Sequence, residues 1–96
     1  MNLLFIVSTQ GAGRLLLPLA AACKRKGTRW SCFFTNDGVK ILAQPGMQEA
    51  ACCAQRVVVC EHSWARFMGE KPCPVELGSQ TQNSIMVGEA DRIVSL

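Results

Sequence analysis

The chain has 96 residues, of which 49% are apolar, and its formal net charge at neutral pH is +3. The length corresponds to one domain, residues 1–96, and the apolar fraction excludes an intrinsically disordered chain. The densest basic cluster, at residues 24–26, ends a predicted helix, where the helix dipole favours it, so nucleic-acid binding is not expected.

Strands and helices alternate along the first half of the chain. Residues 2–8 are a continuous apolar run, which is typical of a strand covered on both faces. The segment TQGAG then turns the chain, and residues 14–26 are predicted to form a helix that ends at Gly27. Residues 28–35 are rich in aromatic and β-branched side chains and predict a second strand.

The next segment has weaker signals. Asn36 or Asp37 is a suitable cap for a short helix over residues 38–44, which the following Pro-Gly pair ends. Residues 47–55 fit either a helical turn or a loop, and the sequence does not decide between them.

The second half repeats the alternation. The expected strands are residues 56–60, 75–77 and 91–96, and the expected helices are residues 62–68 and 79–89. Pro72 and Pro74 restrict the strand at 75–77 to an edge of the sheet. Ser79 and Gln82 have the spacing of a capping box, which opens the last helix. The alternation predicts an α/β fold with three layers, α/β/α, around a mostly parallel sheet of roughly five strands.

Ligands of open α/β sheets bind outside the carboxyl ends of the strands. Three loops are expected to meet there, and only the one after the third strand carries a thiol. The candidate catalytic residue is Cys60, and the candidate binding residues are Ser8, Gly11, Gly13, Asn36, Gly38, Glu61, His62 and Ser63.

Cys60 lies between an apolar strand and a predicted helix. Unpaired N–H groups and the positive end of the helix dipole favour the thiolate, which is the reactive form. Glu61 opposes this effect, Arg66 partly offsets Glu61, and His62 is a candidate to orient or deprotonate the sulfur. The alternative is that Cys60 is a small buried apolar residue, and its position alone favours neither interpretation.

Cofactor and metal sites are not predicted. TQGAG lacks both the third glycine of a dinucleotide-binding loop and the Gly-Lys-Ser/Thr of a P-loop, so it is interpreted as a tight turn. The soft ligands Cys52, Cys53, Cys60, His62 and Cys73 do not have the Cys-x-x-Cys spacing of structural zinc sites.

The first residues, MNLLFIVSTQ, lack the basic region of a secretory signal, and no apolar run reaches the roughly 18 residues of a membrane span. We therefore expect a cytoplasmic protein whose six irregularly spaced cysteines are mostly reduced. A chain this short leaves apolar surface uncovered, which predicts self-association or a stable partner.

Three stretches, GVKILAQPG, VVVCEHSWARFMG and VELGSQTQNSIMVGEADRIVSL, resemble the DsrE/DsrF-like sulfur-relay family (DsrEFH and TusD-like proteins). The resemblance implies a cytoplasmic persulfide carrier, in which Cys60 takes sulfane sulfur from a TusA-like donor protein and passes it to an acceptor. It also implies a homo- or hetero-oligomer. DsrF-like members of the family lack the reactive cysteine and serve as scaffolds.

Three hypotheses about function follow. The first is a sulfurtransferase or sulfur carrier that forms a persulfide on Cys60 without a metal or organic cofactor. The second is a non-catalytic oligomeric subunit or a small-ligand-binding module, in which Cys60 only packs. The third is a thiol redox sensor, in which Cys52, Cys53 or Cys73 resolves an oxidised Cys60.

Overall fold

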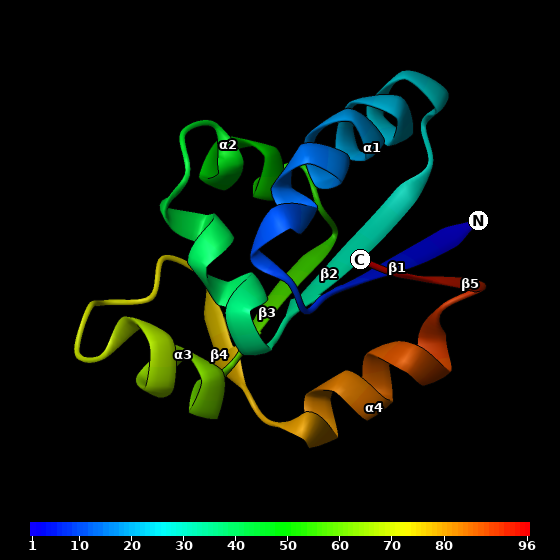
Figure 1. Ribbon diagram of the computed structural model, residues 1–96. Helices are drawn as coiled ribbons and strands as arrows, with labels where there is room; N and C mark the ends of the chain where they lie inside the picture. Colours follow the sequence, from blue (N-terminus) through cyan, green and yellow to red (C-terminus); the bar gives the residue numbers. More distant parts are fainter.

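Five strands form one sheet in the order β4–β3–β2–β1–β5, and every neighbouring pair is parallel. The computed structural model describes residues 1–96 (Figure 1). The strands are β1 Asn2–Val7, β2 Arg29–Phe34, β3 Arg56–Cys60, β4 Glu76–Gly78 and β5 Arg92–Ser95. The predicted α/β class is confirmed, and the sheet expected to be mostly parallel is parallel throughout.

Helical segments connect all the strands. The α-helices are α1 Gly13–Lys26, α2 Met47–Ala51, α3 Glu61–Met68 and α4 Gln80–Glu89, and two 3₁₀ helices are η1 Gln10–Ala12 and η2 Asn36–Ala43. The short helix predicted at residues 38–44 is thus a 3₁₀ helix that begins two residues earlier. The ambiguous segment 47–55 begins as α2 and ends in turns. No helix combines the length and the apolar character that are needed to cross a membrane.

The two faces of the sheet are covered unequally. Alternate strand residues, among them Phe5, Phe34 and Val59, belong to a large core cluster with residues of α1, η2, α2 and α3. The residues between them belong to a second cluster of five, Leu4, Phe33, Val58, Cys60 and Met86, of which only Met86 comes from a helix. Helix α4 therefore covers the second face alone, on the side of the sheet opposite α1 (Figure 1).

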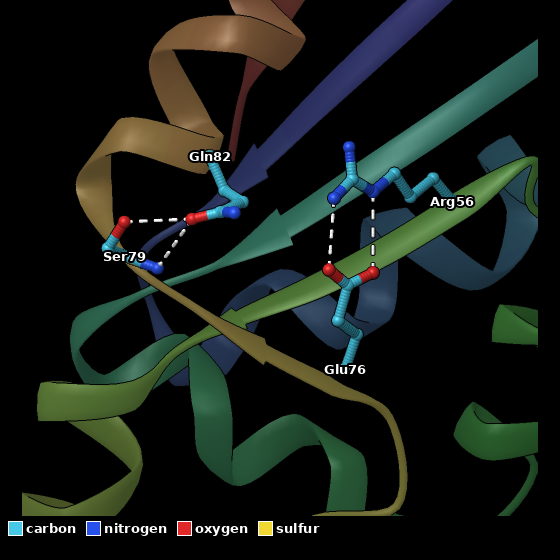
Figure 2. Close-up of polar contacts among 4 residues, drawn as sticks. All are labelled: Arg56, Glu76, Ser79 and Gln82. Atoms are coloured by element: carbon cyan, nitrogen blue, oxygen red, sulfur yellow. Dashed lines mark hydrogen bonds and ion pairs between the residues drawn. The ribbon is translucent and has the colours of Figure 1, made fainter.

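Helix ends follow the local signals in the sequence. Helix α1 ends at Gly27 in the left-handed conformation, with φ at 66°, directly after the basic residues 24–26. Ser79 and Gln82 form the predicted capping box of α4, in which Gln82 Oε1 accepts from the Ser79 N–H at 3.2 Å (Figure 2). Ser79 Oγ also accepts from the Thr81 N–H. The two caps fix where these helices begin and end.

The edge strand β4 has only three residues, as the two prolines before it predict. The Glu76 carboxylate accepts two hydrogen bonds from the Arg56 guanidinium on β3, at 2.9 and 3.3 Å (Figure 2). Such a two-pronged ion pair is geometrically specific, so it helps to hold the short strand in register.

Because Gly38 has no side chain, η2 can lie close to the end of β1. A Cβ at this position would overlap the carbonyl oxygen of Val7, which already accepts a hydrogen bond from the Thr35 N–H at 2.9 Å. Because the clash is with backbone, no side-chain rotation relieves it. Gly38 therefore has a packing role, and the sequence-based assignment of Gly38 to a binding site has no separate support.

We expect Gly38→Ala to lower the free energy of unfolding by about 1–3 kcal/mol, the usual cost of overpacking a filled site. Urea denaturation measures the change. Gly11→Ala is the matched control, since a Cβ at Gly11 meets nothing within 4 Å. The control should change the free energy by less than about 1 kcal/mol. Equal effects of the two substitutions would contradict the close approach.

Candidate functional site

Cys60 ends β3, and Glu61 begins α3 without an intervening residue. Cys60 is the N-cap of the helix and has extended backbone angles, φ −61° and ψ 119°. The sequence-based prediction of a thiol at a strand-to-helix junction is confirmed. The sulfur consequently lies close to the free N–H groups of the first helical turn.

The pKa of Cys60 is lowered from its usual value. Burial by itself raises this pKa, because it penalises the charged form. Polar groups near the sulfur outweigh burial: the Ser63 hydroxyl, the Ser63 backbone N–H and the His62 backbone N–H all favour the charged form, although only the Gln80 amide has the geometry of a hydrogen bond to Cys60 Sγ. The Thr35 hydroxyl, directly after β2, lowers the pKa further and lies 3.4 Å from Ser63 Oγ, with which it shares a hydrogen bond. The site therefore stabilises a thiolate.

Ser63 connects the thiol to the neighbouring loop. It is 8% exposed, and its Oγ accepts a hydrogen bond from the Asn36 backbone N–H at 2.9 Å. Asn36 is in the left-handed conformation, with φ at 50°, which asparagine adopts more readily than most residues. The Ser63 oxygen thus accepts from Asn36 and also shares a hydrogen bond of 3.4 Å with the Thr35 hydroxyl, so Ser63 is held in place beside Cys60.

Gln80 also contacts the sulfur, and sequence reasoning missed it. It is the first residue of α4, and its Nε2 lies 3.8 Å from Cys60 Sγ. The structural reason is that β4 pairs with β3 in parallel, so the chain leaving β4 emerges at the same edge of the sheet as Cys60. The sequence predicted the short strand at residues 75–77 but not the strand with which it pairs.

Cys60 is only 4% exposed, so the thiol that the carrier hypothesis needs to be reachable is covered in this conformation. It lines none of the four surface cavities. Cys60 still differs from the other cysteines whose pKa values are shifted, because its own pKa is lowered. Burial raises the pKa of Cys23, Cys32 and Cys73, and Cys32 is fully buried.

The side chains of Glu61 and His62 are exposed, and neither forms a hydrogen bond with the Cys60 sulfur. His62 contributes its backbone N–H alone, so the imidazole is not placed as a base for the thiol. The guanidinium of Arg66 lies 5.2 Å from the centre of the Phe67 ring and forms no ion pair. Electrostatic control of the sulfur thus comes from neutral donors.

The first loop does not join the site. The Ser8 hydroxyl donates to the Leu96 carbonyl at 3.2 Å, and a Cβ at Gly13 would touch the Gln44 side chain. Gly11 lines a separate polar cavity with Gln10, Arg14 and Gln44. Of the predicted binding residues, His62 and Ser63 lower the pKa of Cys60, and Asn36 is hydrogen-bonded to Ser63.

We predict that Ser63→Ala raises the pKa of Cys60, because the sulfur loses a donor while its burial remains. The pH dependence of the Cys60 ¹³Cβ chemical shift measures this pKa without requiring access to the thiol. Since the folded-state pKa is lowered, ionised Cys60 favours the folded state above its usual pKa, and this contribution is lost as the pH falls through the lowered value.

Ser8→Ala is the control for this titration, since Ser8 also follows a strand end but bonds to Leu96. It should leave the Cys60 titration in place. An unchanged midpoint in Ser63→Ala would show that the serine does not stabilise the thiolate.

Comparison of the chain with protein-family models, with curated proteins and with solved structures gives no match. The functional argument therefore depends on the geometry around Cys60.

Proposed function

We propose that the protein is a sulfur carrier of the DsrE-like kind, which holds sulfane sulfur as a persulfide on Cys60. The observation that supports it most is the set of donors around the sulfur, which lowers the pKa of Cys60 although burial raises it. A cysteine that only packs has no need of such donors, and the fully buried Cys32 has its pKa raised instead. A thiolate is the form that attacks sulfur.

The proposed transfer is a pair of exchanges at sulfur. The Cys60 thiolate attacks the outer sulfur of a donor persulfide; the new S–S bond forms as the donor's S–S bond breaks, and the donor leaves as a thiolate. An acceptor thiolate then attacks the outer sulfur of the Cys60 persulfide and releases the Cys60 thiolate. Electrons balance in each exchange, so neither an external oxidant nor a cofactor is required.

The Gln80 amide contacts the Cys60 sulfur, so we infer that its movement opens access to the thiol. This side chain is exposed, and exposed side chains change rotamer on the picosecond-to-nanosecond timescale. The capping box of α4 uses Ser79 and Gln82, so Gln80 can rotate without loss of the helix cap. In the closed arrangement its amide also donates to the sulfur. We therefore assign Gln80 the role of a movable cover.

A non-catalytic oligomeric subunit is the second candidate, and the 4% exposure of Cys60 favours it. In that case the thiol only fills space where β3 meets α3, and the function resides in the surface. Six large apolar side chains are at least 39% exposed, among them Leu15, Ile85 and Ile93, which fits self-association or a protein partner in either role.

A redox sensor with a resolving cysteine fits the geometry poorly. Cys52 and Cys53 precede β3, whose five residues span about 13 Å, whereas Cα atoms joined by a disulfide lie within about 7 Å. Cys73 packs against the large core cluster, and Cys60 belongs to the cluster on the other face of the sheet.

The proposed setting of the carrier is the cytoplasm, with TusA-like proteins as donor and acceptor partners.

The proposal predicts that the reduced protein gains one sulfur atom per chain when it is incubated with a protein persulfide donor. Intact mass measures the gain, and peptide mapping locates it on Cys60. Cys60→Ser should abolish the gain, whereas Cys53→Ser should retain it, since Cys53 is exposed and remote from the site. Sulfur spread over Cys52 and Cys53, or none at all, would support the non-catalytic subunit.

We further expect Gln80→Ala to speed alkylation of Cys60 several-fold, because the substitution removes the cover. Peptide-resolved mass spectrometry measures the rate. The alkylation rates of the variant and the original protein are compared at a pH where Cys60 is fully ionised, because the loss of the Gln80 amide also affects the ionisation of Cys60. Gln10→Ala, at an exposed glutamine of η1, should leave the rate unchanged. Equal rates in both variants would show that Gln80 does not limit access.

A further inference from the structure

A cavity of about 180 Å³ lies at the end of the sheet opposite Cys60, between α4 and the first residues of β1, β2 and β3. Its wall is formed by Asn2, Leu3, Leu4, Ser31, Gln55, Arg56, Met86, Glu89 and Ala90. Cavities that hold drug-sized ligands begin at about 300 Å³. This one is suited to a smaller molecule.

The cavity exists because one cross-strand row contains a small residue. Leu4, Ser31 and Arg56 are aligned on neighbouring strands, and the adjacent row carries Phe33 and Val58. Phe33 and Val58 fill the space beneath α4, whereas Ser31 does not. The gap is therefore a consequence of side-chain size in one row.

Polar atoms around the cavity lack partners. The Oδ1 atom of Asn2 is buried without a hydrogen bond, although the rest of this residue is held: its N–H donates to Asp91 at 2.7 Å and its Nδ2 to the Glu89 carbonyl at 3.5 Å. The Ser31 hydroxyl forms no hydrogen bond either. An unpaired buried acceptor is costly, and a ligand in the cavity relieves this cost if the Asn2 side chain turns its Oδ1 atom toward it.

Two opposite charges border the same space. Arg56 uses Nε and Nη2 to bind Glu76 and leaves Nη1 without a partner. The Glu89 carboxylate forms no ion pair, yet it contributes to the raised pKa of Arg56, after the larger effect of Glu76. Glu89 is thus near Arg56 but not in contact with it.

The local charge selects among small ligands. Glu76 already neutralises Arg56, and Arg29, two residues before Ser31 on the same face of β2, balances Glu89, so the surroundings disfavour a ligand with a net charge. A simple amine would satisfy Glu89 but leave Arg56 Nη1 without a partner. A molecule with both an ammonium and a carboxylate satisfies both ends, and Leu4 and Met86 provide an apolar wall.

We propose that this cavity binds a free α-amino acid, with its ammonium group toward Glu89 and the Asn2 Oδ1 atom and its carboxylate toward Arg56 and Ser31. The site is independent of the thiol, since β3 separates the two by about 13 Å.

The test is a titration of ¹⁵N-labelled protein with the common α-amino acids, followed by the amide signals of Asn2, Ser31 and Arg56. At least one amino acid should shift these signals saturably. Its decarboxylated amine and its deaminated acid should bind about tenfold more weakly or worse, because each loses a charged hydrogen bond. The absence of shifts with every amino acid at millimolar concentration, or equal binding of the amine, would overturn the proposal.

Two variants locate the site. Glu89→Gln, an exposed change that does not threaten folding, should weaken binding about tenfold, while Glu70→Gln, an exposed carboxylate outside the cavity, should not. Ser31→Val should fill the gap and abolish binding. Cys60→Ser should retain binding, so the outcome is separate from that of the sulfur-carrier proposal. Binding that survives in both Glu89→Gln and Ser31→Val would place the ligand elsewhere.

Discussion

The direct passage from β3 into α3 is the constraint on which the site depends. Because Cys60 is both the last strand residue and the helix N-cap, its sulfur is buried beside N–H groups that the helix itself cannot pair. Burial raises the pKa of the Cys60 thiol, the neighbouring polar groups lower it, and the lowering effect is the larger one. A linker of one or two residues would separate these effects and leave either an ordinary core cysteine or an ordinary exposed one.

A single helix on one face of the sheet links the two ends of the molecule. Helix α4 begins beside Cys60, where Gln80 contacts the sulfur, and ends beside the cavity, where Glu89 and Ala90 form part of the wall. Only Met86 of this helix is fully buried. A helix so lightly packed can adjust at small cost, since little apolar area is lost when it moves.

Local patterns predicted the elements closely. The strands and most helices lie within two residues of their expected bounds, since apolar runs, glycine stops and the Ser79–Gln82 capping box are properties of short segments. Cys60 could be singled out in the same way, because a strand end followed by a helix start is visible along the chain. The 3₁₀ form of η2 was not visible, since Gly38 and its neighbours take that form while packed tightly against the end of β1.

The sequence by itself determined the order of strands and helices, the α/β class and the position of the one thiol at a helix start, because these depend on residues close together in the chain. Only the tertiary structure decided which side chains surround that thiol. Thr35, Ser63 and Gln80 lie around the sulfur from three separate parts of the chain, while His62, two residues from Cys60, has an exposed side chain. The reason is that strand order and helix placement, not spacing along the chain, set contacts between distant residues, and they also left the gap at Ser31.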